Sequence, residues 1–104
     1  MDPLPVRMGG LAANLARVGS FSVHEGGKAA VIGLLEESKY FIEWTAVEYD
    51  VSTAAELVDI QRQLVKWNRA IDSIWTDADK RKEIGDQARE ISTRLLSKSG
   101  LLDQ

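Results

Sequence analysis

The sequence predicts an all-α fold, an up-and-down helical bundle of three long antiparallel helices plus a shorter N-terminal helix. The only two prolines, Pro3 and Pro5, lie at the start of the chain, so no later residue lacks the backbone N–H that a helix interior requires. Apolar residues recur at spacings of three and four along most of the chain, as in amphipathic helices. A chain of 104 residues favours a single domain, 1–104, of which we expect 1–5 to form a flexible leader.

The short N-terminal helix is expected over residues 6–18, because its apolar residues have helical spacing. They are Met8, Leu11, Leu15 and Val18. Ser22 and Glu25 have the spacing of a capping box, which predicts the start of a second helix. The glycine pair that follows allows a start nearer Lys28, and the helix is expected to end near Tyr49. Its main apolar face comprises Val31, Ile32, Leu34, Leu35, Phe41, Ile42, Ala46 and Tyr49.

The third helix has the clearest pattern in the chain. Thr53 and Glu56 match a second capping box, and the apolar residues that follow step by three, four, three, four and three. They are Leu57, Ile60, Leu64, Trp67, Ile71 and Ile74. Because this is the a/d spacing of helices that pair as in a coiled coil, we expect one helix from Thr53 to Trp75.

The last helix is expected to follow a cap at Thr76 or Asp77, since both side chains can accept from unpaired N–H groups at a helix start. Gly100 is its expected C-cap. We interpret residues 75–78 as a tight turn, and one long kinked helix is the alternative. Short connections of this kind make consecutive helices antiparallel neighbours.

The second helix carries more apolar surface than one core face needs. Tyr40, Trp44 and Val47 are spaced by four and three, so they share one side of the helix, away from its main apolar face. Val58 and Val65 form a smaller stripe on the third helix. One interpretation is that the N-terminal helix covers this surface. The covering residues would then be Leu11, Leu15, Val18 and Phe21.

The other interpretation is that the two stripes form an interface with a second chain. Aromatic side chains are enriched in protein interfaces, where Trp and Tyr act as anchors. A small core also gains stability through oligomerisation. We favour this interpretation, with a homodimer or another protein as the partner.

Basic residues on the last two helices are candidate contacts for nucleic acid or another anion. They are Arg62, Lys66, Arg69, Lys80, Arg81 and Lys82. Acidic neighbours flank both groups and weaken their field, and the net charge of −3 is unlike that of a duplex binder. The sequence therefore disfavours nucleic acid as a partner.

We expect no catalytic residue, no cofactor and no metal site. The chain has no cysteine, which excludes disulfides, thiolate catalysis and cysteine-based zinc sites. His24 is the only histidine and cannot form a two-histidine metal site. The segment 26–28 ends like a phosphate-binding loop, but Ser22 replaces the required glycine and Ala29 the required Ser or Thr.

Taken together, these patterns predict a non-enzymatic interaction or regulatory module that acts through an apolar helix stripe. We expect it in the cytoplasm, with which the absence of cysteine is compatible, and away from membranes, because the longest apolar run, 29–35, is far too short to span a bilayer. Two alternatives stay open. One is a nucleic-acid-associated regulator that uses its basic helix faces, and the other is a small all-α enzyme with a pocket between the second and last helices.

Overall fold

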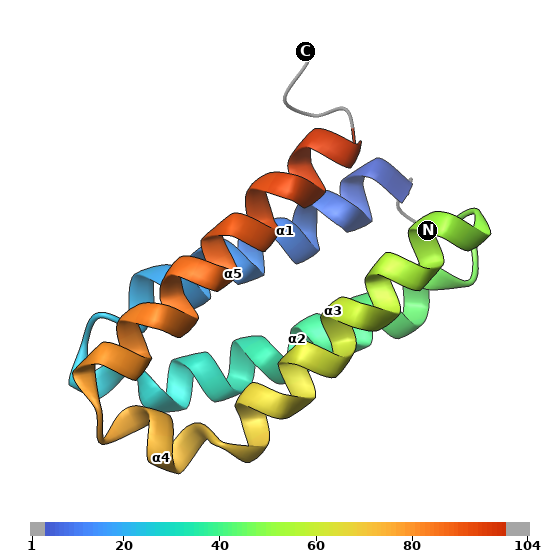
Figure 1. Cartoon of the computed structure of the whole chain (residues 1–104). Coiled ribbons are helices and arrows are strands. Elements are labelled where there is room, and N and C mark those ends of the chain that lie inside the picture. The colour runs from blue at the N-terminus through green and yellow to red at the C-terminus, as the bar shows by residue number, and fades with distance from the viewer. Residues whose placement is uncertain (1–3, 100–104) are drawn as a thin grey trace.

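The structure, a computed structural model, describes residues 4–99 and confirms the all-α bundle. Its elements are α1 (Leu4–Phe21), the 3-10 turn η1 (Glu25–Gly27), α2 (Lys28–Ala46), α3 (Val51–Arg69), α4 (Ile71–Trp75) and α5 (Ala78–Ser99). Within the described residues there is no strand. The four long helices run alternately up and down (Figure 1).

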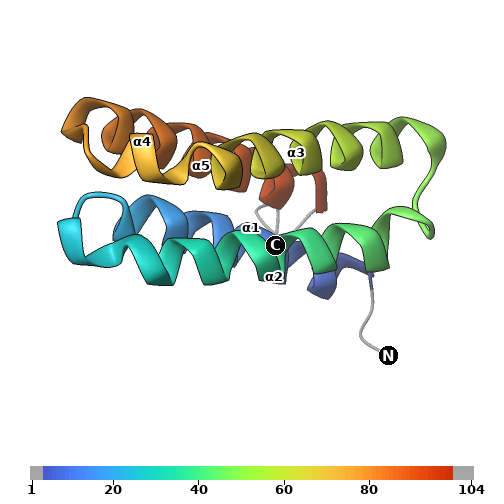
Figure 2. The ribbon, with the colours of Figure 1, turned by 90° about the horizontal axis from the view of Figure 1, so that it is seen from below.

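The helices form two layers, with α1 and α2 in one layer and α3, α4 and α5 in the other (Figure 2). α1 packs closely on both α2 and α5, and α2 packs on α3. α3 and α5 lie further apart, since neither is a principal packing partner of the other. The bundle is therefore closed on three of its four sides, and the side between α3 and α5 is more open.

The core runs along the whole bundle and receives side chains from all five α-helices. Its buried apolar residues are Met8, Leu11, Ala12, Leu15, Val18, Val31, Leu35, Ile42, Leu57, Ile60, Leu64, Trp67, Ile71, Ile74, Trp75, Ile84, Ala88, Ile91 and Leu95. They include all six apolar residues, from Leu57 to Ile74, that step by three and four in the expected third helix. That seam faces the interior, as the a/d pattern predicts.

α1 is longer than the sequence suggested. It has 18 residues against 19 in α2 and α3 and 22 in α5, so it is the shortest of the four long helices, but it extends beyond the expected 6–18 at both ends. It begins at Leu4 and includes Pro5, which was expected in an extended leader. Proline is tolerated in a first helical turn because the N–H that it lacks would have no intrahelical partner there. The rest of the expected leader, 1–3, and the expected C-cap Gly100 lie outside the described residues.

The connection between α1 and α2 does not use the predicted capping box. The Ser22 hydroxyl is buried and donates a hydrogen bond of 2.5 Å to the Val18 carbonyl, so it ends α1 instead of starting α2. η1 follows, and α2 begins at Lys28, the later of the two starts considered. α2 ends at Ala46, three residues before the expected end at Tyr49.

α3 is capped by a residue that the sequence analysis placed in the preceding break. The Asp50 carboxylate accepts from the Thr53 N–H at 3.3 Å, and the helix begins at Val51. Hydrogen bonding to Thr53, from its side chain first and its backbone N–H second, lowers the pKa of Asp50 below its usual 3.8. The predicted Thr53–Glu56 box is therefore wrong, because an acceptor three residues earlier already satisfies the Thr53 N–H.

The expected single helix from Thr53 to Trp75 is interrupted at Ala70. Hydrogen bonds of α-helical spacing continue across it, from the Ala70 N–H to the Lys66 carbonyl and from the Ile74 N–H to the Ala70 carbonyl. The break separates α4, which places Ile74 and Trp75 in the core at the end of the bundle. A turn then leads into α5, where the Asp77 carboxylate accepts from the Asp79 and Lys80 N–H groups, as the expected cap should.

α1 and α5 approach each other closely through small residues. A Cβ added at Gly85 would lie 3.3 Å from the Gly19 carbonyl oxygen, and one added at Gly19 would lie 2.6 Å from Cγ of Arg89. The buried Ser92 hydroxyl donates to the Ala12 carbonyl at 2.6 Å. Across residues 4–99, every helix is too short or too polar to cross a lipid bilayer.

Candidate interaction surface

The apolar stripe on α2 faces solvent. Tyr40 is 69% exposed, Trp44 46% and Val47 84%. The core side of the same helix is formed by other residues: Val31, Leu35, Ser38, Ile42 and Thr45. The stripe is therefore extra apolar surface that the core of this chain does not use, as its spacing predicted.

α1 does not cover this stripe. Leu11, Leu15 and Val18 are fully buried in the core, and Phe21 is 41% exposed. These are the residues that the first interpretation assigned to the cover, so that interpretation is wrong. α1 turns its apolar face inward because that face is needed to fill the core between α2 and α5.

One residue of α1, Arg7, does reach the edge of the stripe. Its guanidinium carbon lies 4.9 Å from the centre of the Trp44 ring, and Nη1 donates to the Trp44 carbonyl at 3.3 Å. The same nitrogen lies 2.5 Å from the Glu48 carboxylate. Arg7 is buried, so it fixes the indole in one orientation while leaving nearly half of Trp44 exposed. Sequence reasoning missed this contact, since no spacing links Arg7 to α2.

The neighbouring part of α3 carries the smaller stripe of two valines. Val58 is 38% exposed, Val65 is partly buried, and both line a shallow hollow of about 470 Å³. α2 and α3 are joined there by two side-chain hydrogen bonds: Gln61 Nε2 donates to Glu43 Oε1 at 3.2 Å and Asn68 Nδ2 to Glu36 Oε1 at 2.8 Å. The α2–α3 surface is defined here by Tyr40, Trp44, Val47, Val58 and Val65, so the structure brings all five predicted contacts onto two adjacent helices.

The two helices that form this surface carry charges of opposite sign. The solvent side of α2 is acidic, with Glu36, Glu37 and Glu43, and Glu48 follows in the turn after the helix. The solvent side of α3 is basic, with Arg62, Lys66 and Arg69, which line the same hollow as the two valines. Arg62 lies 3.5 Å from Asp59, with both side chains more than 70% exposed, so this pair contributes little to stability.

The six basic residues predicted as anion contacts do not converge. Arg81 folds back on α4, donating to the Trp75 carbonyl at 2.7 Å, with its guanidinium 6.0 Å from the Trp75 ring. Lys82 pairs with Asp86 at 2.9 Å, and this hydrogen bond raises the pKa of Lys82 and lowers that of Asp86. Of these six residues, only Lys66 on α3 and Lys80 on α5 line the same hollow from two different helices.

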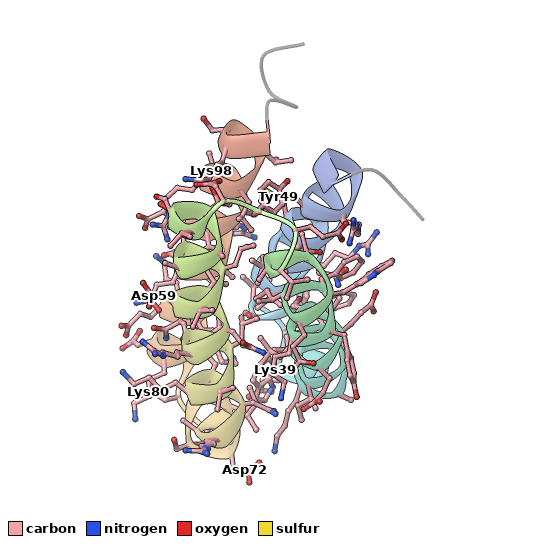
Figure 3. The ribbon with its side chains drawn as sticks, turned by 90° about the vertical axis from the view of Figure 1, so that its right-hand side faces the viewer. Lys39, Tyr49, Asp59, Asp72, Lys80 and Lys98 are labelled. Carbon is pink, nitrogen blue, oxygen red and sulfur yellow. The ribbon has the colours of Figure 1, made fainter. Side chains whose placement is uncertain are left out.

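That hollow lies in the open side of the bundle, between α3 and α5, and not between α2 and α5. It has a volume of about 610 Å³, and a second hollow of about 460 Å³ continues it toward the far end of the two helices. The floor contains Trp67 and Ile91, and the walls carry charges of both signs. Figure 3 shows Asp59 of α3 and Lys80 of α5 on this side of the bundle, whereas Lys39 of α2 lies on the other side of α3.

Within residues 4–99, no three side chains of His, Cys, Asp or Glu lie together in a way that could hold a metal ion. His24 is exposed in the turn before η1. No protein family, curated protein or solved structure matches the chain. The described residues thus form an all-helical bundle with a solvent-facing apolar stripe on α2, acidic residues beside it on the same helix, and basic residues on the adjacent α3.

Proposed function

We propose that this chain is a non-enzymatic helical interaction module, which self-associates or binds a partner protein through the α2–α3 surface. The observation that supports the proposal best is the distribution of residues on α2. Ser38 and Thr45 occupy core positions on this helix, and neither hydroxyl has a hydrogen-bond partner. Tyr40 and Val47 face solvent instead. Folding of the single chain buries little of these two side chains.

Burial of this surface against another protein would be favourable. Covering a large apolar side chain contributes about 1.5–3 kcal/mol, and aromatic anchors contribute most in interfaces. Trp44 suits such a role because Arg7 and Phe41, whose ring centre lies 6.4 Å away, already hold its ring in place. Little side-chain entropy would then be lost on binding.

The same observations favour protein docking over the two alternatives. A nucleic-acid contact would need the basic residues on one face, but Arg81 and Lys82 are engaged within the C-terminal half. An enzyme would need a pocket with converging catalytic groups. The hollow between α3 and α5 instead has an open, mixed-charge wall. We also propose a cytoplasmic location, in keeping with the cysteine-free sequence.

The proposal can be tested by site-specific photo-cross-linking in the cells that produce the protein. A photoreactive phenylalanine at position 47 samples the α2–α3 surface, and the same residue at position 23 is the control. Val23 is 58% exposed but lies in the turn after α1, away from the surface. We expect discrete adducts from position 47 alone, identified by mass spectrometry. No adduct at position 47, or identical adducts from both positions, would refute the docking role.

A further inference from the structure

We propose that the occupant of the α2–α3 surface is a second copy of this chain, with α2 of each copy packed on α3 of the other about a two-fold axis parallel to the helices. This inference rests on the proposed docking function and names its partner and geometry. It is carried by two properties of the surface: the opposite charge of its two helices and the alignment of their residues.

The charges select one of two symmetric arrangements. When two copies meet face to face, a two-fold axis perpendicular to the helices places α2 on the partner's α2 and α3 on the partner's α3. That arrangement brings acidic faces together and basic faces together, which is repulsive. An axis parallel to the helices places each acidic α2 face, with Glu37 and Glu43, on a basic α3 face, with Arg62 and Lys66. Only this arrangement is electrostatically complementary.

The alignment of α2 and α3 within one chain then fixes which residues would meet. Glu43 is level with Gln61, and Glu36 with Asn68, as their hydrogen bonds show. Because the two helices are antiparallel, a step of seven residues toward the C-terminus of α2 corresponds to a step of seven residues toward the N-terminus of α3. By the same count, position 47 is level with 57, position 40 with 64, and position 37 with 67. Rotation about an axis parallel to the helices leaves these levels unchanged.

Four residues of α2 therefore lie level with a suitable residue of the other copy's α3 to within one position, a rise of about 1.5 Å. Val47 meets Val58, and Tyr40 meets Val65 at the apolar centre. Glu37 meets Lys66 at the outer edge, and Glu43, at the seam where it accepts from Gln61, is level with Arg62. These four pairs place apolar residues opposite apolar ones and acids opposite bases, as in a protein interface.

Three of the four charged residues are not held by a buried ion pair within the chain, whereas Glu43 accepts from Gln61. Among the described residues, neither Glu37 nor Lys66 forms an ion pair within the chain, and Arg62 has only the exposed contact with Asp59. Val58 and Val65 share their hollow with Arg62 and Lys66, so an apolar side chain and a carboxylate from α2 of another copy can enter it together. The hollow of about 470 Å³ is large enough for such side chains.

Charge reversal tests the proposal. One purified variant carries Arg62→Glu and Lys66→Glu, so both of its faces are acidic. The other carries Glu37→Lys and Glu43→Lys, so both are basic. We expect the unaltered chain to dimerise, each variant alone to dimerise at least about tenfold more weakly, and an equimolar mixture to form a heterodimer, all measured by native mass spectrometry and sedimentation. Circular dichroism confirms that each variant is folded.

A matched control separates this effect from a general change of charge. Lys80→Glu with Arg94→Glu changes the net charge as much as Arg62→Glu with Lys66→Glu, but at the hollow between α3 and α5. This control should dimerise like the unaltered chain. A monomeric unaltered chain would overturn the second-copy proposal, while the docking function would still be decided by the cross-linking at position 47.

Engineered disulfides distinguish the two arrangements, because the chain contains no cysteine of its own. Two chains, one with Tyr40→Cys and the other with Val65→Cys, should become cross-linked when mixed and oxidised. Tyr40→Cys alone should not. Rapid cross-linking of Tyr40→Cys with itself, or variants of reversed charge that dimerise normally, would overturn the packing of α2 on α3 of the other copy.

Discussion

Substitution of Gly27 by alanine should destabilise the bundle more than its position in a surface turn suggests. Gly27 is buried where η1 meets α2, and an added Cβ would overlap the Phe21 carbonyl oxygen and lie 3.0 Å from its carbon. That oxygen also accepts from the His24 N–H at 3.2 Å. Relieving the overlap requires a backbone shift that costs about 1–3 kcal/mol. Weakening the hydrogen bond adds about 1 kcal/mol.

Gly26→Ala is the matched control, because no heavy atom lies within 4 Å of a Cβ added there. Its stability should be unchanged or raised by up to about 1 kcal/mol. For a chain of this length, the loss expected in Gly27→Ala corresponds to a melting temperature lower by roughly 10–20 °C. Thermal and urea unfolding followed by circular dichroism measure both variants. Equal stability of Gly26→Ala and Gly27→Ala would refute the steric argument.

Three further variants test individual features of the helices. Folding lowers the pKa of Asp50, so its ionised carboxylate stabilises α3 at neutral pH, and this contribution is lost as the pH falls below 3.8. The unfolding midpoint of Asp50→Asn should therefore decline less from pH 6 to pH 3 than that of the unaltered chain. Burial raises the pKa of Tyr49 above its usual 10.0, and the nearby Arg7 opposes this only in part. Tyr49 thus stabilises the fold below that pH, and in a Tyr40→Phe chain the phenol should titrate by absorbance with a midpoint above 10.0. Gly33 is exposed in mid-α2 with no heavy atom within 4 Å of an added Cβ, so Gly33→Ala should raise the free energy of unfolding by about 1 kcal/mol, and an unchanged urea midpoint would contradict this.

Periodicity predicted the parts of the fold in which one helix face meets the core. Leu57 and Leu64 are buried in α3, and Val31 and Leu35 in α2, because side chains three and four residues apart share a face whatever the helix packs against. The Asp77 cap was also predictable, since its hydrogen bonds are local. These features depend on residues close together in the sequence, so they can be read without knowing the tertiary arrangement.

Features that depend on tertiary packing were missed. Alanine is the best helix former, so nothing at Ala70 predicts the break between α3 and α4. The burial of Ser38 and Thr45 was also missed, because both are polar residues inside an apolar pattern. The length of α1 was underestimated because its glycines lower helix propensity, whereas packing on α2 and α5 holds the helix together.

At the candidate surface, too, local features could be predicted and features that depend on tertiary packing could not. The exposure of Tyr40 and Val47 could be predicted, because they lie on the side of α2 opposite its core residues. The contact of Arg7 with Trp44 could not, since the residues are 37 positions apart and meet only when α1 packs on α2. The hollow between α3 and α5 was likewise hidden, because its existence depends on the spacing of two helices that do not pack closely.

The unpartnered hydroxyl of Thr45 allows stability and association to be separated by experiment. Thr45 is 3% exposed, and its Oγ1 has no hydrogen-bond partner in the described structure. Thr45→Val replaces that hydroxyl with a methyl group of similar size, which removes a desolvation penalty of about 1–3 kcal/mol. We expect a more stable bundle with an unchanged dimerisation constant, because the residue faces the core and the α2–α3 surface faces solvent.

The complementary variant is Val47→Ser, which removes an 84% exposed side chain. It should leave the free energy of unfolding of a dilute sample almost unchanged and weaken dimerisation. If Thr45→Val and Val47→Ser instead altered both quantities in parallel, the two faces of α2 would be energetically coupled. The exposed stripe would then be part of the folding unit, and its assignment as a separate docking surface would be wrong.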